Sequence, residues 1–292
     1  MATLSDIKRR ITSIQSTQKI TSAMKMVSAA KLRRAQDAIE SARPYAARMR
    51  ATLQEVGAAE AGSSHPLFEE RDAVSTAELV VITSDRGLAG AFNSQIVKEA
   101  GRLIEDWKAE GINTRLTLVG KKGSEYFRRH RPSQITDDRA VGPRANYLEA
   151  QQIAQRLILD FENGQVDRVV LLHNEFISAM TQTPKIVPLL PFVSERADAE
   201  AETDAEEAPY EIEPSAEKLL ASLVPKAVEV EVFRALLESQ AGEHAARMSA
   251  MENATKNTEE LIERLTLEYN RARQAAITSE LVEIITGAQA LE

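Results

Sequence analysis

The chain has 292 residues, of which 43% are hydrophobic, and it carries a formal net charge of −8. The apolar share is enough for a core, and the length suggests two structural units, or one unit with an elongated part. Cysteine is absent, which excludes disulfides, thiol catalysis and cysteine-ligated metals. The four histidines lie far apart and lack zinc-binding spacing, so we expect no metal site.

The sequence also lacks the signals of a membrane-spanning or secreted protein. No apolar run approaches the ~18 residues that a membrane helix needs. The first residues, MATLSDIKRRI, contain no apolar stretch of the signal-peptide kind. We therefore expect a soluble protein of a reducing compartment with no membrane span.

Positive and negative charges are separated along the chain. Residues 1–50 contain eleven lysines and arginines against three acids, and residues 195–217 contain ten acids against one base. The first segment is a basic arm and the second is acidic. Basic residues without interleaved aromatics suit nucleic-acid phosphate only weakly, and they suit acidic loops of a protein partner equally well. A merely solvated helix face is the third interpretation.

The first predicted element is one helix over residues 4–56. No glycine precedes Gly57, and Pro44 is the only proline in this stretch. Asp6 or the serine before it can cap the start, and Gly57 follows the end. We expect Pro44 to bend the helix, and we assign residues 1–57 to it.

Residues 75–195 have the pattern of an α/β unit. Ten of the twelve glycines lie between residues 57 and 195, as in a region with many turns. Strand and helix patterns alternate, which favours a mostly parallel sheet with helices on its faces. The last two strands are joined by a short stretch, so we expect them to pair antiparallel. The expected strands are 78–83, 114–119, 168–173 and 185–190, and the expected helices are 93–109, 122–130 and 144–162.

Two loops are candidates for ligand binding. Ser84–Gly90 follows the first strand and precedes a helix, where α/β sheets usually bind ligands. It matches neither common glycine-rich nucleotide motif, and a tight turn with Asp85 as a cap explains it better. Gly120–Gly123 could attract phosphate through its two lysines, but an ordinary loop is the simpler interpretation. His173 is expected to be structural, and no nucleophile–base set can be assembled, so we expect no catalytic residue and no cofactor.

An acidic, low-complexity segment, residues 195–212, follows the α/β unit. We expect it to be a solvated loop or a disordered insert. A helical pattern then covers residues 215–286, with Pro225 and Gly242 as expected kinks. We assign residues 213–292 to this second long helix.

The two terminal helices are too long to be buried inside one domain. At ~1.5 Å per residue they would extend about 80 and 108 Å. A lone protruding helix is only marginally stable, so we expect the two to pair. Apolar residues recur at intervals of three and four in both, but small and polar residues interrupt the seams. We infer that the helices also pack against other chains; a plain coiled-coil stalk is the alternative.

The C-terminal end of the sequence, residues 281–291, is unusual because it is apolar and rich in small side chains. Chain ends are normally polar. An apolar end on a long helix must be covered by surrounding protein. Pairing with the chain's own N-terminus could cover only part of it.

Long, specific motifs occur at both ends and at the centre of the chain. They are ITSIQSTQKIT (11–21), AMKMVSAAKLRR (23–34), SDRGL (84–88), EHAARM (243–248), ATKN (254–257), YNRARQAAIT (269–278) and EL (280–281). Through these motifs the chain resembles the gamma-subunit family of the F-type ATP synthases, over essentially its whole length. The members of that family are central rotor shafts.

The resemblance implies an α/β fold with long helices: an antiparallel coiled coil of the N- and C-terminal helices plus a Rossmann-like α/β foot domain. It implies that three alpha and three beta subunits surround the shaft, and that the epsilon subunit and the membrane c ring meet the foot. Proton flow through the c ring would turn the asymmetric shaft and change nucleotide affinity at each beta site in turn. The catalytic groups belong to beta, so this chain is expected to be a non-catalytic subunit, peripheral on the cytoplasmic face of a bacterial inner membrane.

The resemblance also implies which positions contact the beta subunits. Three lie in the front motif, one lies in EHAARM, and three match residues gripped by a beta catch loop. These positions are Lys19, Met24, Lys25, Arg247, Arg273, Gln274 and Thr278. Tyr210 and Glu213 would lie where the foot meets the c ring and epsilon. For each position the alternative is ordinary coiled-coil surface.

Two departures from the family pattern are visible. Ala89 stands where many relatives carry cysteine, and the 195–209 part of the acidic segment is longer and more acidic than expected. Two other classes of protein stay open from the residues alone. One is an α/β enzyme that uses the Ser84–Gly90 loop; the other is a basic coiled-coil nucleic-acid binder, although no nucleic-acid partner is implied by the family.

Overall fold

The computed structural model describes residues 3–59, 66–69, 71, 73–192 and 216–289. They form two compact units, one made of Met1–Ala29 with Arg247–Glu292 and the other of Ala30–Ala246. The acidic segment 195–212 lies outside the described residues, and so do Tyr210 and Glu213.

Two long helices occupy the two ends of the chain, as the sequence predicts. Helix α1 spans Leu4–Ala59, and α5 spans Ala216–Gln289. Each contains a proline, Pro44 or Pro225, and each continues through it. Neither proline is among the buried residues, whereas the alanine two positions later is buried in both helices. Packing of the neighbouring residues therefore offsets the hydrogen bond that a helical proline loses.

The α/β unit contains one five-stranded sheet in the order β3-β2-β1-β4-β5. Three of the four neighbouring pairs are parallel, and β4 and β5 pair antiparallel, which confirms the prediction for the last two strands. The sequence analysis missed β3, a short edge strand of mostly polar residues (ITDDR) with no apolar run. The strands are β1 (Thr76–Ile82), β2 (Asn113–Val119), β3 (Ile135–Arg139), β4 (Arg168–Phe176) and β5 (Gln182–Leu190).

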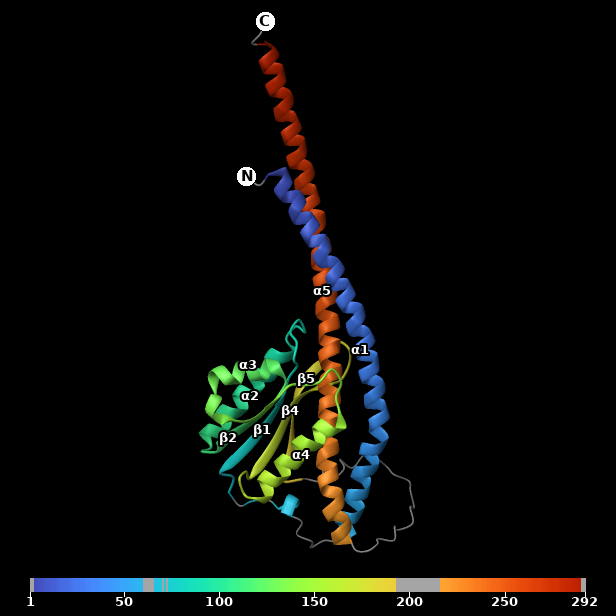
Figure 1. Ribbon diagram of the computed structural model, residues 1–292, viewed down its shortest axis with the longest axis vertical. Helices are drawn as coiled ribbons and strands as arrows, with labels where there is room; N and C mark the ends of the chain where they lie inside the picture. Colours follow the sequence, from blue (N-terminus) through green and yellow to red (C-terminus); the bar gives the residue numbers. More distant parts are fainter. Residues whose placement is uncertain (1–2, 60–65, 70, 72, 193–215, 290–292) are drawn as a thin grey trace. The chain divides into compact units, whose positions relative to one another are not determined.

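Helices cover both faces of this sheet (Figure 1). Helices α2 and α3 lie on one face, and α4 lies on the other together with the parts of α1 and α5 that belong to this unit. The three predicted short helices are confirmed within a few residues; they are α2 (Phe92–Ala109), α3 (Lys121–His130) and α4 (Tyr147–Glu162). Two short 3₁₀ turns, Pro66–Phe68 and Pro132–Gln134, also lie among the described residues of this unit.

Strand β1 is buried on both faces, and its side chains alternate between two apolar cores. Leu79 and Val81 pack in the core under α2 and α3. Val80 and Ile82 pack in the other core, which also contains residues of α4 and α5. Such near-continuous burial is typical of a parallel strand covered by helices on both sides. Because α5 contributes to the second core, its first part is an integral element of the α/β unit.

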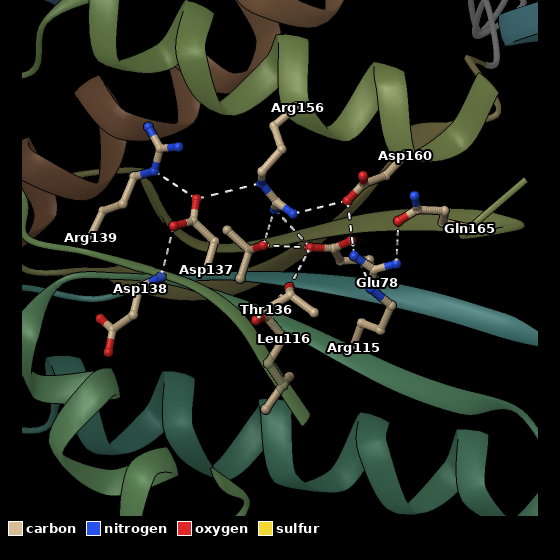
Figure 2. A network of polar contacts seen from close by, with 11 residues as sticks. Glu78, Arg115, Leu116, Thr136, Asp137, Asp138, Arg139, Arg156, Asp160 and Gln165 are labelled. Carbon is tan, nitrogen blue, oxygen red and sulfur yellow. Dashed lines mark hydrogen bonds and ion pairs between the residues drawn. The ribbon is translucent and has the colours of Figure 1, made fainter. Parts of the chain in front are cut away.

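A buried polar network fastens α4 to the sheet (Figure 2). Glu78 of β1 is fully buried and accepts hydrogen bonds from Thr117 (2.5 Å), Thr136 (3.0 Å) and Arg156 of α4 (2.8 Å). Arg156 also pairs with Asp160 at 3.0 Å, and Arg115 of β2 reaches the same aspartate at 2.9 Å. Each charge in the network therefore has an opposite charge beside it, as burial of ions requires.

Candidate partner-binding surfaces

The loop Ser84–Gly90, the candidate ligand loop of the sequence, is fixed by internal hydrogen bonds. The Ser84 amide donates to Asn93 Oδ1 of α2 at 2.9 Å. Asp85 Oδ1 accepts from the amides of Lys121 and Val141, both at 3.0 Å. Asp85 therefore accepts from the first amide of α3, and not from the start of the helix that follows the loop, α2, for which the sequence predicted it as a cap.

The second candidate loop, Gly120–Gly123, has no amide left for a phosphate. Its four successive N–H groups donate to acceptors of the chain: Arg139 O (2.7 Å), Asp85 Oδ1 (3.0 Å), Ser84 O (3.0 Å) and Thr83 Oγ1 (2.9 Å). Phosphate-binding loops instead aim such groups at the ligand. The segment is therefore structural, as expected, but the expected loop is the start of a helix: Gly120 is the N-cap of α3, and Lys121–Gly123 are its first residues.

Helix α5 fills the place where open α/β sheets bind ligands. That place is the carboxyl edge between β1 and β4, where the strand order reverses. There Glu238 of α5 contacts His173 at the carboxyl-end half of β4, Nε2 to Oε2 at 3.2 Å. At Gly242 a Cβ atom would lie 3.2 Å from Phe92 of α2, so α5 packs closely here. The predicted structural role of His173 is confirmed.

In the other unit, α1 and α5 pair antiparallel, and polar contacts occur at intervals along the pairing. Gln18 donates to Glu259 at 3.1 Å, the hydroxyls of Thr21 and Thr255 meet at 2.9 Å, and Lys25 pairs with Glu252 at 2.9 Å. The partner number in α5 falls as the number in α1 rises, which defines the antiparallel direction. Small and polar residues therefore form part of the seam itself, and they bury little apolar surface.

The three predicted contact residues of α1 differ in exposure. Lys19 is exposed, and Met24 and Lys25 are partly buried. The hydrogen bond and the charge of Lys25 lower the pKa of Glu252 below its ordinary value. The sequence analysis missed three more apolar side chains in this part of α1, each over half exposed: Ile20, Met26 and Val27. The sequence could have revealed them, because these apolar residues lie next to the positions that pair with α5 and not at those positions.

The C-terminal part of α5 extends past the start of α1 (Figure 1). Extending the pairing register places Leu4, the first residue of α1, level with Arg273. Beyond this point large apolar side chains are 49% to 68% exposed: Ile277, Leu281, Val282, Ile284 and Ile285. A monomeric protein rarely leaves a contiguous apolar stretch of this kind in water, so the stretch indicates a protein-binding surface.

The predicted contact residues of α5 fall into two groups. Arg273, Gln274 and Thr278 are exposed and lie next to the apolar stretch. The Thr278 hydroxyl donates to the Gln274 carbonyl at 2.9 Å, so its oxygen can still accept a bond from a partner. Arg247 is only 8% exposed, so its guanidinium offers little surface. Tyr210 and Glu213 lie outside the described residues.

Two further findings concern the described part of the chain. It contains no cluster of three or more histidines or carboxylates that could hold a metal ion. None of its helices combines the length and the apolar character needed to cross a membrane.

Together these features define a class: a helical, partner-binding subunit with an α/β unit whose usual ligand edge is occupied by its own last helix. Comparison with known proteins gives the family. The family model described as ATP synthase matches residues 3–291. The ATP synthase gamma chains of Desulforamulus reducens and Anaeromyxobacter sp. (strain K) are 47% and 49% identical, each over the full length of both chains. The chain therefore belongs to the family of ATP synthase gamma chains.

Solved structures agree with this assignment. A chain of the Tetrahymena thermophila mitochondrial ATP synthase central stalk and c-ring structure matches with a TM-score of 0.60 and 29% identity, covering 80% of this chain and 99% of that chain. A chain of the Euglena gracilis mitochondrial ATP synthase matches with a TM-score of 0.66, covering 99% and 94%. At 21% identity the latter supports the fold alone.

Proposed function

We propose that this chain is the central rotor shaft of a proton-translocating ATP synthase. It couples rotation of a membrane c ring to the conformational cycle of the catalytic beta subunits, in ATP synthesis and in hydrolysis. The observation that carries this proposal is the exposed apolar end of α5, which extends past the start of α1. The end of a shaft that turns inside a ring of other subunits needs an apolar surface that those subunits can cover.

The mechanism follows from asymmetry. A ring of three alpha and three beta subunits offers the shaft three equivalent sites, but α1 and α5 present different side chains in different directions. Each beta subunit therefore meets a different face, and the face that it meets favours one of its conformations. A tenfold change in nucleotide affinity needs a difference in contact free energy of about 1.4 kcal/mol. When the shaft turns, the beta subunit that has the most favourable contact free energy changes from one site to the next.

The chain itself is proposed to be non-catalytic. The amides of Gly120–Gly123 are used internally, and α5 occupies the sheet's usual ligand edge. These contacts argue against the α/β enzyme alternative. The catalytic groups and the nucleotide would belong to the beta subunits.

The proposed contacts with beta divide between the two helices. Lys19, Met24 and Lys25 of α1 would face beta levers, and Arg247 of α5 would take part in the coupling. The catch loop of beta would grip Arg273, Gln274 and Thr278, whose exposure supports this role. Long cationic and amide side chains donate several hydrogen bonds to carboxylates and carbonyls.

The remaining partners would meet the α/β foot. They are the epsilon subunit and the c ring, with Tyr210 and Glu213 as the proposed contact positions. The chain would then be peripheral on the cytoplasmic face of a bacterial inner membrane, held there as part of the ATP synthase.

Reconstitution tests this function. The purified chain is mixed with separately purified alpha and beta subunits, and ATPase turnover is compared for the wild type and for Arg273→Ala/Gln274→Ala. Arg264→Ala is the control, because this exposed arginine lies on the same helix within the paired part. We expect a stable complex with high turnover, lower turnover for the double variant, and an unchanged control.

The other outcomes separate the parts of the proposal. If the complex forms and the double variant equals the wild type, the shaft function stands and the assigned catch residues are wrong. If no complex forms and the chain alone binds nucleotide, the shaft function is wrong and the enzyme alternative gains support. Steeply salt-dependent DNA binding by the chain would instead favour the nucleic-acid class.

A further inference from the structure

Within the unit Ala30–Ala246, α5 is attached to the α/β fold by an apolar stripe. Val228, Val232 and Leu236 are nearly or fully buried, and they belong to the core that β1 and α4 share. Apolar contacts are non-directional. A stripe of this kind therefore resists separation of α5 from the sheet and large rotations that would expose it to water, but by itself it defines the exact rotational angle of α5 less sharply than directional contacts do.

Polar contacts fix one flank of this stripe. Glu229 of α5 is 4% exposed and accepts a hydrogen bond from the hydroxyl of Tyr147 of α4 at 2.7 Å. The amide of Gln151, one turn further along α4, donates to both carboxylate oxygens of Glu229 at 3.2 Å. Burial of the phenol and its bond to Glu229 raise the pKa of Tyr147 far above its ordinary value, so the phenol stays a donor.

A second contact repeats this attachment along the same flank. Gln240 follows Glu229 by about three helical turns and points within about 20° of the same direction. Its Oε1 accepts from the amide of Ala145, immediately before the N-cap of α4, at 3.1 Å. Two points on one side of α5 are thus joined to the start of α4.

The opposite flank is fixed to the sheet. Glu238 lies about 180° round the helix from Glu229. Its carboxylate contacts Nε2 of the fully buried His173 of β4 at 3.2 Å and pairs with Arg234 of α5 at 2.8 Å. Burial raises the pKa of Glu238, but the hydrogen bond with His173 and the charge of Arg234 together bring it below its ordinary value. Glu238 is therefore an ionised acceptor for the histidine.

The described side chains of α1 make no equivalent attachment in this unit. Its buried side chains here are apolar; they include Leu32, Ile39 and Leu53. Among the side chains of α1 that the structure describes between Ala30 and Leu53, none makes a hydrogen bond or ion pair with another element, and Ser41 bonds only within the helix. The polar attachment of the unit is therefore concentrated on α5.

We propose that Glu229, Gln240 and Glu238 lock α5 against rotation about its own axis, so that α5 is the helix that carries torque from the α/β foot into the shaft. This inference rests on the proposed rotor function. Any rotation of α5 would lengthen contacts on one flank and compress those on the other. Helix α1, held by apolar contacts, follows α5 through their pairing.

Single-molecule rotation of the assembled ATP synthase tests the inference. The chain contains no cysteine, so Lys108→Cys on the exposed surface of α2 gives one labelling site on the foot. With the catalytic head fixed, the angular variance of a probe at this site during a catalytic pause reports torsional stiffness. The test variant is Glu229→Leu/Gln240→Leu, which removes one flank.

Two matched variants separate locking from general damage. Glu231→Leu removes an acid of α5 that bonds to Arg234 of the same helix and to no other described element, while Arg234 keeps its bond to Glu238. Glu229→Gln keeps an oxygen that can accept from Tyr147. We expect the angular variance to rise by up to about twofold in the double variant, because two flanks act in parallel, one is lost, and the rest of the shaft twists in series with them. We expect the wild-type variance for Glu231→Leu and nearly that for Glu229→Gln.

The outcomes distinguish failure of the rotor function from failure of the locking role. If the wild-type complex does not rotate, the rotor function itself is wrong. If it rotates and the double variant has the wild-type variance, or if Glu231→Leu raises the variance equally, the locking role is wrong even when the melting temperature of the variant falls. If the double variant fails to assemble, Gln240→Leu carries the test, since it leaves Glu229 bonded; unchanged variance there overturns the inference.

Discussion

Glu78 of β1 and Arg156 of α4 form an ion pair at 2.8 Å in which the carboxylate is completely buried. The pair connects the central strand of the sheet with the helix that covers it (Figure 2). A buried ion pair adds little net stability compared with apolar residues of the same shape, but removal of the carboxylate leaves its buried hydrogen-bond donors without their acceptor.

Glu78→Ala is therefore expected to destabilise the α/β unit by about 1–3 kcal/mol, because both arginines keep Asp160 as a partner. The variant leaves Arg156 and Arg115 without the Glu78 carboxylate and removes the acceptor of Thr117 and Thr136. Urea unfolding followed by circular dichroism measures the change. The control is Arg102→Ala, which breaks only exposed pairs on α2 and should change the unfolding free energy by less than about 1 kcal/mol. Equal losses in the two variants would contradict this account of the network.

Two glycines should respond to alanine in opposite ways. Gly120 has φ 104°, and a Cβ atom there would lie 2.2 Å from the Thr83 carbonyl oxygen, so Gly120→Ala should cost about 3–5 kcal/mol. Gly101 lies inside α2, and a Cβ atom there would have no neighbour within 4 Å, so Gly101→Ala should gain about 0.5–1 kcal/mol. Thermal unfolding of both variants is the measurement. A lower melting temperature for Gly101→Ala would show that α2 is constrained in a way that its surroundings do not reveal.

Asp167 should make the stability of the α/β unit depend on acid pH. Its carboxylate accepts from the Ser75 amide (2.9 Å), the Ser75 hydroxyl (2.7 Å) and the Thr76 amide (2.9 Å), and pairs with Arg71 at 3.2 Å. Burial raises the pKa of Asp167, but these bonds and the arginine charge outweigh it, so the pKa lies below its ordinary value of 3.8. The stabilisation is therefore fully present above pH 3.8 and is lost as the pH falls through the lower pKa of the folded state.

Asp167→Asn is the corresponding variant. It should lower the unfolding free energy by about 1–3 kcal/mol near neutral pH, because an amide accepts fewer bonds and carries no charge for Arg71. The difference from the wild type should stay constant down to pH 3.8 and shrink below it. Urea titrations across this range measure the difference. A difference that persists unchanged at the lowest pH would mean that shape, and not ionisation, explains the effect.

The sequence predicted most of the fold because the periodicity of its elements is strong. The run at Glu78–Thr83 is apolar on both faces, and the helix at 93–109 repeats apolar residues on one side; both occur in the structure. Strand β3 was missed because an edge strand needs no apolar run, and its pairing with β2 begins with a register shift next to Leu116. Local periodicity contains no information about such an edge.

The candidate surfaces were predictable only in part. The exposed end of α5 follows from a run of apolar residues at a chain end. The locking contacts of Glu229 and Glu238 do not follow from the sequence, because acids on a long helix are usually solvated. Their partners, Tyr147 and His173, lie far away in the sequence and meet α5 only through the tertiary fold. The same holds for Gly120–Gly123 at the start of α3, because only the fold brings the acceptors of these amides beside them.

The exposed apolar end of α5 should matter for assembly and not for the stability of the chain. Leu281 and Ile284 are 53% and 68% exposed and lie past the start of α1, so Leu281→Ser/Ile284→Ser removes no buried contact. The unfolding free energy of the isolated chain should change by less than about 0.5 kcal/mol. In the reconstituted complex with alpha and beta subunits, the same variant should weaken assembly or lower ATPase turnover, because the lost apolar surface would have been buried by the surrounding subunits. Glu260→Ser/Glu263→Ser, exposed on the same helix within the paired part, is the matched control. If the apolar variant assembles and turns over like the control, the end of α5 is not the surface that the partners enclose.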